Sequence, residues 1–332
     1  MLLKNNIKHI VIAGSSGGHI LPAIKYLNEL SHHCSSDQIL FITNEVGQDY
    51  LHLIEYDKKN IIQINSINKI TFLFKIIQKI GKILLNNKVT ILGFGGFISV
   101  PILYFAKITN IFFLKGHHIN FHEQNFIYGL ANKFNYLVAH NVFTSFPNNQ
   151  FKAKEIFVGN FFTNLDKNLD NLDPKLINIL LIGGSSGSLE LNKFLSSQLT
   201  KIENALIKKL RFYIQVPKKY KEEISSEYKN LDVDIDFFTF NGSLNFKDFD
   251  LIISRSGSGS LHEILYNNNN VYFIPHLHSR DGHQTLNLNY FKIHGYSLNN
   301  FDIPHSKKIS EEYINSLINP FSMQKILCYL TR

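Results

Sequence analysis

The sequence predicts an α/β protein made of two Rossmann-like domains that face a cleft. A glycine-rich loop occurs twice, at Gly14–Gly18 and at Gly183–Gly187, each directly after a short apolar run and before a helical pattern. The two loops lie 169 residues apart in a chain of 332 residues. Because a glycine loop between a strand and a helix lets backbone N–H groups approach a phosphate, each half is expected to bind a phosphate-bearing ligand.

Strands and helices are predicted to alternate through the first half. Apolar positions Ile20, Ile24 and Leu27 follow the helical spacing, which predicts a helix over Ile20–Leu30. Alternation of this kind favours a parallel sheet covered on both faces. The predicted strands are Ile7–Ala13, Ile39–Thr43, Ile61–Ile64, Val89–Leu92, Ile111–Lys115 and Tyr136–Ala139.

A polar stretch rich in aspartate, residues 163–175, is the predicted linker, so the domains are expected at 1–162 and 176–332. The last segment is a candidate to return to the first domain. In the second half the pattern restarts at Ile177. The further strands expected there are Arg211–Val216, Asp234–Phe238, Leu251–Ser254 and Val271–Ile274.

The net charge of +8 is unevenly distributed. Residues 1–160 contain 15 Lys, no Arg and 8 acidic residues, a charge of +7, and the rest of the chain carries +1. The first half is therefore expected to meet an anionic partner, either nucleic acid or a membrane surface. The absence of arginine and of a nucleic-acid-binding module there disfavours nucleic acid.

Composition also indicates the compartment. No run reaches the roughly 18 apolar residues of a membrane span, and no signal-peptide pattern is present, so the chain is expected to stay in the cytoplasm. Cys34 and Cys328 give no disulfide framework. His32, His33 and Cys34 could be metal ligands, but adjacent residues rarely converge on one ion, and no metal site is predicted.

Residues 69–85 form the most amphipathic segment. Lys75, Lys79 and Lys82 fall on one helical face, and the opposite side is apolar. One interpretation is a helix that covers the sheet with a solvated lysine face. The other is a membrane-surface helix, because Phe72, Phe74 and Ile83 exceed what one core-facing stripe needs. Both interpretations hold if one edge of the helix packs on the sheet and another contacts lipid.

An ordered set of motifs resembles the MurG family, the bacterial glycosyltransferases that convert lipid I to lipid II. The motifs are Gly14–Pro22, Gly93–Pro101, His122–Asn125, Gly129–Lys133, Gly159-Asn160, Gly183–Asn192, Arg255–Gly257 with Glu263, and Asp281–Asn287. The resemblance covers nearly the whole chain. It implies a metal-independent, inverting transferase of GT-B architecture without a cofactor. It also implies a peripheral position on the cytoplasmic face of the inner membrane and a role in peptidoglycan synthesis.

The resemblance implies that the first domain binds the lipid-linked muramyl-pentapeptide and the second UDP-N-acetylglucosamine. His19 titrates in the range of a general base for the acceptor hydroxyl, although it could instead bond to backbone at a helix start. Glu123 is the rival base or an orienting partner for His19. His122–Asn125 could also be only a strand-end turn. The predicted acceptor-binding residues are Gly95, Gly96, His122 and Asn125.

The predicted donor site draws mainly on the second glycine loop and the motifs after it. Glu263 would accept hydrogen bonds from the ribose hydroxyls; the alternative is a carboxylate in the first turn of a helix. His283 and Gln284, with Asp281 and Asn287 nearby, would recognise the sugar; the alternative is the polar start of a helix. The residues predicted to bind the UDP-sugar are Ser16, Gly17, Gly18, Asn125, Thr163, Ser185, Ser186, Gly187, Thr239, Glu263, His283 and Gln284.

The chain also departs from the family pattern. Thr163 stands where the family has an arginine that reaches the diphosphate, so Arg255 or Arg280 would have to replace it. Ser186 replaces the usual glutamine, and the segment after Pro320 is short. Two other functions are therefore kept open. One is a UDP-sugar epimerase of the same fold, and the other is a non-catalytic protein that binds nucleotide-sugar or membrane.

Overall fold

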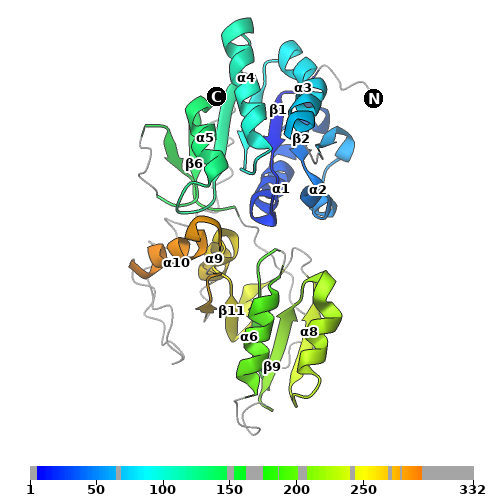
Figure 1. The fold of residues 1–332 in the computed structure, drawn as a ribbon, viewed down its shortest axis with the longest axis vertical. Helices are drawn as coiled ribbons and strands as arrows, with labels where there is room; N and C mark the ends of the chain where they lie inside the picture. Colours follow the sequence, from blue (N-terminus) through cyan, green and yellow to red (C-terminus); the bar gives the residue numbers. More distant parts are fainter. Residues whose placement is uncertain are drawn as a thin grey trace. The chain divides into compact units, whose positions relative to one another are not determined.

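The computed structural model describes residues 6–64, 69–147, 153–161, 175–185, 187–200, 208–239, 244–267, 271–276 and 279–293. These residues form two compact units, which meet in the sequence between Phe162 and Thr163 (Figure 1). The predicted linker, apart from Lys175, and everything after residue 293 lie outside the described residues.

The first unit is built on a parallel sheet of seven strands in the order β3-β2-β1-β4-β5-β6-β7. Its strands are β1 (His9–Ile12), β2 (Ile39–Thr43), β3 (Ile61–Gln63), β4 (Thr90–Gly93), β5 (His118–Glu123), β6 (Asn141–Thr144) and β7 (Glu155–Phe157). Its α-helices are α1 (Gly17–Ser31), α2 (Glu45–Gln48), α3 (Lys69–Asn86), α4 (Ser99–Phe113) and α5 (Leu130–Val138). Short 3₁₀ turns occupy Ser36–Gln38, Leu51–Leu53 and Lys58–Asn60.

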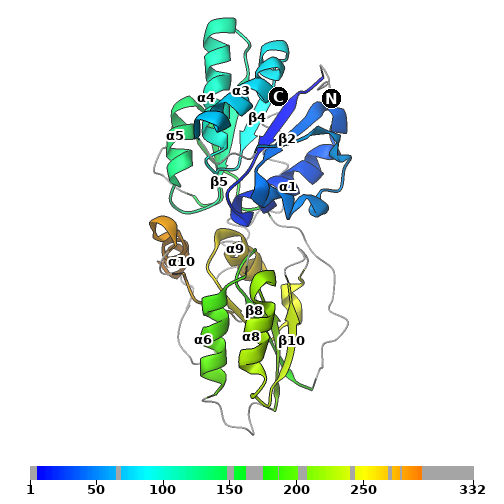
Figure 2. The ribbon, with the colours of Figure 1, turned by 45° about the vertical axis from the view of Figure 1, so that its right-hand side comes forward.

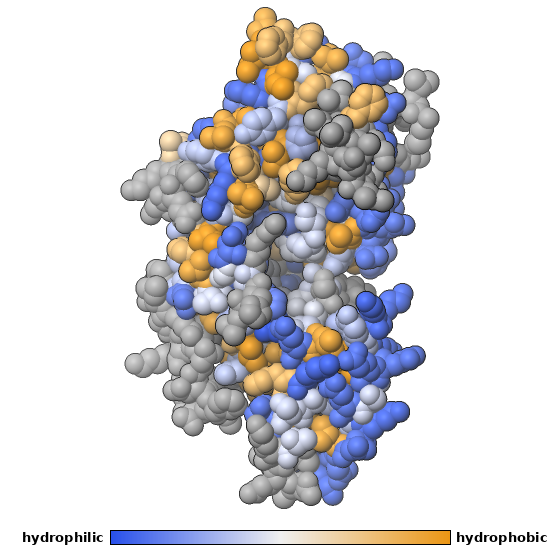
Figure 3. Space-filling model, viewed as in Figure 1, coloured by the Kyte–Doolittle hydropathy of each residue, from blue (hydrophilic) through white to orange (hydrophobic). Residues whose placement is uncertain are grey.

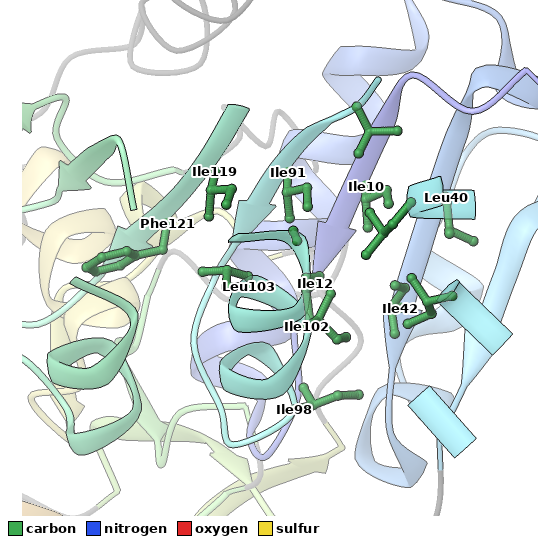
Figure 4. Close-up of a cluster of buried hydrophobic side chains, with 14 of the residues drawn as sticks. Ile10, Ile12, Leu40, Ile42, Ile91, Ile98, Ile102, Leu103, Ile119 and Phe121 are labelled. Carbon is green, nitrogen blue, oxygen red and sulfur yellow. The ribbon is translucent and has the colours of Figure 1, made fainter. Parts of the chain in front are cut away.

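Both faces of this sheet are buried, as a parallel sheet requires. Successive residues of a strand point to opposite faces, so Ile10 and Ile12 enter one core while Val11 enters the other. The first core lies under α3, α4 and α5, and Figure 4 shows its isoleucines converging from neighbouring strands. The second core lies under α1, on the other side of the sheet (Figure 2).

The second unit has a parallel five-stranded sheet in the order β10-β9-β8-β11-β12. Its elements are β8 (Ile177–Ile182), α6 (Leu189–Leu199), β9 (Leu210–Gln215), α8 (Lys221–Tyr228), β10 (Asp234–Phe238), β11 (Leu251–Ser254), α9 (Ser258–Tyr266), β12 (Val271–Phe273) and α10 (His283–Ile293), with 3₁₀ turns at Lys218–Tyr220, Phe246–Asp248 and Arg280–Gly282. Helices α6 and α8 pack side by side on this sheet. The prediction of two parallel-sheet α/β domains is confirmed.

Two predicted strands are wrong. Ile111–Phe113 is the last turn of α4, and Tyr136–Val138 is the last turn of α5. Both segments are rich in aromatic and branched residues, a composition that favours buried strands. The actual strands β5 and β6 begin with the polar residues His118 and Asn141, which weakened their apolar signal, and β7 was not predicted.

The interpretation of α3 also changes. Ile83, counted among the apolar residues in excess of a core stripe, is buried with Ile76, Ile80 and Leu84 in the first core. Phe74 is exposed on the same helix, and the side chains of Phe72 and Lys75 lie outside the described residues. Helix α3 is therefore a sheet-covering helix. No helix in the described part of the chain combines the length and the apolar character that crossing a membrane requires.

Candidate active site

The predicted site residues of the first unit gather at the carboxyl edge of its sheet. The strand order reverses between β1 and β4, and doubly wound sheets bind their ligands beside this switch point. The loop after β1 ends at Ser16, and Gly17 and Gly18 begin α1; the loop after β4 carries Gly95 and Gly96. The sequence and the topology thus bring the two glycine loops of this unit to the same place.

The two glycines after β4 are required by close packing. Gly95 and Gly96 have φ of +99° and +81°, a region that favours glycine. A Cβ on Gly95 would lie 2.8 Å from Nδ1 of His19, and a Cβ on Gly96 would lie 2.6 Å from the carbonyl oxygen of Gly14. Any larger residue would therefore push this loop away from His19.

His19 lies half-buried in the first turn of α1, and its ring is oriented by Gln124. Nδ1 of His19 is 3.1 Å from Oε1 of Gln124, whose Nε2 donates to the carbonyl oxygen of Phe94 at 2.9 Å. Because a carbonyl can only accept, the amide nitrogen of Gln124 must face Phe94, and its oxygen faces His19. Nδ1 of His19 then carries the proton, which leaves Nε2 with the lone pair of a base.

Glu123 is committed to the loop that follows β5. Its carboxyl is buried and accepts from the backbone N–H of Asn125 at 2.9 Å and of Gly129 at 3.1 Å. It also accepts from Nδ2 of Asn125 at 3.3 Å and of Asn132 at 2.8 Å. The orienting partner of His19 is therefore Gln124, and Glu123 holds the loop and the start of α5.

The other residues of this motif differ in their access to solvent. His122 is fully buried, with its ring 4.6 Å from that of Phe161 and Nε2 3.3 Å from Oγ of Ser145. It lies beneath the loop. Asn125 is half-buried, and both its backbone and its side-chain nitrogen face Glu123. Ser16 and Gly18 are exposed, whereas Gly17 is buried.

In the second unit, the loop after β8 is clamped by a residue to which the sequence assigned no role. Gln215, at the end of β9, accepts from the backbone N–H of Gly183 at 2.7 Å and donates to the carbonyl of Gly184 at 2.6 Å. A Cβ on Gly187 would lie 3.0 Å from Pro217. Ser185 is half-buried, and Ser186 lies outside the described residues.

Arg255 is fully engaged in holding this loop. Its guanidinium donates to Oγ of Ser188 at 3.1 and 3.3 Å, to the carbonyls of Ile274 and Pro275 at 3.2 Å, and to Glu190 at 2.9 Å. Burial lowers the pKa of Arg255, and the carboxylate of Glu190 opposes that shift. Arg255 therefore positions the start of α6. The side chain of Arg280 and all of Thr163 lie outside the described residues.

The remaining donor residues lie on α9, α10 and the end of β10. Glu263 is half-buried in the second turn of α9, whose first turn contains no acidic residue, so the alternative of a first-turn carboxylate is wrong. Gln284 accepts from the backbone N–H of His276 at 2.8 Å through Oε1. His283 begins α10 and is half-buried, and Thr239 is exposed after β10.

The start of α10 is strained. Asp281 has φ of +57°, and Gly282, at +63°, follows it in the same left-handed region. Asp281 is exposed, whereas Asn287, one helical turn into α10, is fully buried.

In the described part of the chain no group of three or more His, Cys, Asp or Glu side chains is arranged to hold a metal ion.

Comparisons with known proteins agree with this arrangement. The model of the glycosyltransferase family 28 N-terminal domain matches residues 9–144, and that of its C-terminal domain matches residues 178–322. A protein of Wolbachia sp. subsp. Brugia malayi (strain TRS) is 30% identical over 297 residues, which cover 86% of this chain and 82% of that protein. It is named UDP-N-acetylglucosamine–N-acetylmuramyl-(pentapeptide) pyrophosphoryl-undecaprenol N-acetylglucosamine transferase. The chain belongs to the MurG family of glycosyltransferases.

Further relatives extend the match over more of the chain. A protein of Pelagibacter ubique (strain HTCC1062) with the same name is 28% identical over 338 residues, covering 95% of this chain and 89% of its own. Among solved structures, MurG of Acinetobacter baumannii has a TM-score of 0.62 at 22% identity, covering 98% of this chain and 91% of its own. A UDP-GlcNAc 2-epimerase from Methanocaldococcus jannaschii has a TM-score of 0.60 at 14% identity, covering 98% and 99%. At these identities the structural likeness shows the fold alone.

Two residues beside the glycine loops were not predicted from the sequence to have a role. Gln124 lies inside the motif His122–Asn125, and Gln215 lies outside every motif. Both are polar residues at or just beyond the carboxyl end of a buried strand beside a glycine loop. In the sequence, a polar residue at the end of a buried strand beside a glycine loop could have indicated this role, because a buried polar side chain there needs a hydrogen bond to the loop.

Proposed function

We propose that this chain transfers N-acetylglucosamine from UDP-N-acetylglucosamine to the lipid-linked muramyl-pentapeptide, the conversion of lipid I to lipid II. The names of its relatives at 28–30% identity support the reaction. The observation that carries the chemistry is the hydrogen bond between Nδ1 of His19 and Oε1 of Gln124. Because this bond occupies Nδ1, the basic Nε2 on the other side of the ring is left for the substrate hydroxyl. The epimerase alternative has support only from structures of 11–14% identity among those compared.

The reaction is a single displacement with inversion. Nε2 of His19 takes the proton of the acceptor hydroxyl while that oxygen bonds to C1 of N-acetylglucosamine. The bond from C1 to the diphosphate oxygen breaks, and its electron pair leaves with UDP. The buried hydrogen bonds of Glu123 support this choice, because a carboxyl already holding four donors is poorly placed to attack C1 in a double displacement.

The charge that develops on UDP is met by backbone rather than by a metal. The loop 184–188 precedes the N-terminus of α6, where the helix dipole and the first-turn N–H groups that Ser188 does not cap favour an anion. Gln215 and Arg255 hold this loop from two sides. The donor contacts proposed in the second unit are Ser185, Ser186, Gly187, Thr239, Glu263, His283 and Gln284, with Thr163 from the preceding segment.

The acceptor binds at the carboxyl edge of the first sheet. Gly95 and Gly96 are proposed to receive the acceptor pyrophosphate on their backbone, and Asn125 the neighbouring sugar. His122, being buried, supports this surface from beneath. Ser16, Gly17 and Gly18 are proposed to complete the contacts to the UDP-sugar.

A lipid-linked acceptor requires the first unit to bind the cytoplasmic face of the inner membrane. The surface that fits lipid best is here called the α4–α5 apolar surface: Ile108, Ile111, Phe112, Phe113, Leu114, Leu130, Phe134 and Leu137, all exposed. Exposed apolar side chains in such number mark an interaction surface. The exposed Phe74, Lys79 and Lys82 of α3 are proposed to flank it, as part of the segment 69–85.

One assay tests this function against its alternatives. Release of UDP and formation of an epimer from UDP-N-acetylglucosamine are both measured, with and without added lipid acceptor. We expect release only with acceptor. Turnover of UDP-N-acetylglucosamine to an epimer without acceptor would establish the epimerase, and the absence of turnover with both substrates bound would establish a binding protein.

A further inference from the structure

Helix α5 turns polar side chains toward the interior of the first unit. Its buried residues include two asparagines, Asn132 and Asn135, whereas its exposed apolar residues are Leu130, Phe134 and Leu137. Figure 3 shows apolar residues also on the outer surface of this unit, over α4. A buried amide costs stability unless it is hydrogen-bonded, so the partners of the two asparagines indicate what these residues do.

The two asparagines belong to one chain of hydrogen bonds, here called the α5 relay: Glu123, Asn132, Asn135, Ser99 and the carbonyl of Gly96. Nδ2 of Asn132 donates to Oε2 of Glu123 at 2.8 Å, and Nδ2 of Asn135 donates to Oδ1 of Asn132 at 3.2 Å. Nδ2 of Asn135 also donates to Oγ of Ser99 at 2.8 Å, and this hydroxyl donates to the carbonyl of Gly96 at 2.8 Å. All the side chains of the relay are buried. The relay therefore joins the loop after β5 to the loop after β4 through the protein interior.

Glu123 sets the direction of every bond in the α5 relay. Its carboxyl accepts from four N–H donors, so the amide nitrogen of Asn132 faces it and the amide oxygen faces Asn135. The carbonyl of His122, 3.4 Å from the same nitrogen, requires the same orientation. Asn135 must then present its nitrogen to Asn132, and its second N–H reaches Ser99. Because the hydroxyl of Ser99 accepts this bond, its own proton goes to the glycine loop after β4.

The loop after β4 is thereby tied at two points to the motif at the end of β5. Gln124 donates directly to the carbonyl of Phe94 at 2.9 Å. Its neighbour Glu123 holds the carbonyl of Gly96 through the α5 relay. The backbone N–H of Ser99 adds a second bond to the carbonyl of Gly96 at 3.1 Å. Two fixed carbonyls leave the peptide planes of this loop little freedom to rotate.

Fixing these carbonyls also fixes the N–H groups that the loop presents. In a planar trans peptide the C=O and the N–H point in opposite directions. The N–H of Gly95 therefore points away from Gln124, and the N–H of Phe97 points away from Ser99. Between them, φ of +99° at Gly95 and +81° at Gly96 turns the backbone. Successive backbone N–H groups in such a turn can bind an anion.

We propose that Asn135 is a positioning residue for the acceptor-binding loop, and that the α5 relay orients the N–H groups of this loop toward the acceptor pyrophosphate. This rests on the acceptor site proposed above and extends it to two buried residues, Asn135 and Ser99. The loop also packs against the base, since a Cβ on Gly95 would lie 2.8 Å from Nδ1 of His19. A displaced loop would therefore move the acceptor relative to His19.

The α5 relay can be cut by single substitutions. Oδ1 of Asn135 has no hydrogen-bond partner among the described residues, so Asn135→Leu removes only the two N–H donors of the relay at nearly constant volume. Ser99→Ala cuts the next link. The matched control is Asn60→Leu, because Asn60 is also buried and also donates two bonds from Nδ2, to the carbonyls of Ser36 and Asp37 at 3.3 Å. Asn60 precedes β3, at the opposite edge of the sheet. Thermal melting verifies that each variant folds.

Kinetics with a short-chain, water-soluble acceptor test the positioning role. We expect Asn135→Leu to raise the acceptor KM roughly tenfold and to leave the donor KM as in wild type. The double variant with Ser99→Ala should be no worse than Ser99→Ala alone, because both substitutions cut the same relay. Asn60→Leu should lower the melting temperature and change neither KM. A wild-type acceptor KM in folded Asn135→Leu, or effects that multiply in the double variant, would overturn the proposal.

Amide hydrogen exchange tests the α5 relay without turnover. The N–H of Ser99 is bonded to the carbonyl of Gly96, so its exchange should accelerate roughly tenfold or more in Asn135→Leu and stay as in wild type in Asn60→Leu. Unchanged exchange at Ser99 in Asn135→Leu would overturn the relay whatever the kinetics. A wild-type protein without acceptor-dependent release of UDP would overturn the proposed function and the acceptor role, while the exchange at Ser99 would still decide whether the relay holds the loop.

Discussion

Oε1 of Gln124 lies 3.1 Å from Nδ1 of His19 and fixes which nitrogen of the imidazole is the base. The amide of Gln124 is itself fixed by its bond to the carbonyl of Phe94. His19 in the first turn of α1, with Phe94 and Gln124 in the loops after β4 and β5, thus defines one tautomer of the neutral ring. A histidine whose second nitrogen is held in this way loses little orientational freedom when it removes a proton.

Removing either member of this pair should slow the chemical step. His19→Ala should lower kcat by about 10²–10⁴, the contribution of a general base. Gln124→Leu should lower kcat roughly 10- to 100-fold with little change in the donor KM, because the ring is still present but misoriented. Steady-state kinetics with saturating acceptor measures both. A loss confined to donor KM would assign His19 to the structure of the loop.

Glu123 should behave as a structural residue. Glu123→Gln places an amide N–H among the four donors around this buried side chain, so the free energy of unfolding should fall by about 3 kcal/mol. Denaturant titration measures this, with the exposed Glu55→Gln as the control. The kcat of the folded fraction should change less than in His19→Ala. Unchanged stability with a larger loss of kcat would exchange the roles of Glu123 and His19.

The motifs predicted site residues that the first unit brings to one edge of its sheet, but they could not assign the hydrogen bonds there. The strand–glycine–helix pattern identifies His19 and the second loop because local sequence dictates a turn after a strand. The partner of His19 lies 105 residues away in sequence, and only the parallel pairing of β1, β4 and β5 brings it near. Glu123 and Gln124 are adjacent and point to different neighbours, which no sequence pattern distinguishes.

The strand errors have a related cause. Ile111–Leu114 has the composition of a buried strand, yet it is among the most exposed apolar segments of the described chain. An apolar segment is expected to be buried inside the protein only if water is the alternative environment of its side chains. Ile111–Leu114, which the sequence wrongly predicts as part of a strand, are half of the residues of the α4–α5 apolar surface.

Glu263→Ala should weaken donor binding. The carboxylate is proposed to accept from two ribose hydroxyls, and losing hydrogen bonds to a charged group costs roughly 1.5–3 kcal/mol, or about 10- to 150-fold in donor KM. The exposed Glu222→Ala on α8 is the matched control. A folded Glu263→Ala enzyme with the donor KM of wild type would remove this residue from the site.

Thr163→Arg should tighten the binding of UDP. Arg255 donates to Ser188, Glu190 and two backbone carbonyls. It is therefore not available to contact the diphosphate in place of the arginine that the family pattern has at position 163. A guanidinium at position 163 would offer a bidentate, charge-assisted contact to the diphosphate. Calorimetry on Thr163→Arg and on the long neutral Thr163→Gln measures the gain. Equal affinities for the two variants would show that another group already binds the diphosphate.

The proposed membrane contact can be divided experimentally between charge and apolar area. The lysine variant carries Lys75→Gln, Lys79→Gln and Lys82→Gln on α3, and the apolar variant carries Phe134→Gln and Leu137→Gln on α5. Each lysine near an anionic surface contributes about 1 kcal/mol, and this attraction is screened by salt. The lysine variant should therefore lose binding to anionic vesicles mainly at low ionic strength.

The apolar variant should show the opposite salt dependence. Phe134 is 49% exposed and Leu137 68% exposed, and inserting such side chains into the bilayer is favourable at any salt concentration. Its binding should fall most at physiological ionic strength, where the charges are screened. Turnover on a short-chain, water-soluble acceptor should be that of wild type for both variants, since neither touches the catalytic edge. If the apolar variant sediments with vesicles like wild type while the lysine variant does not, the bilayer lies against α3, and the exposed face of α5 serves another partner.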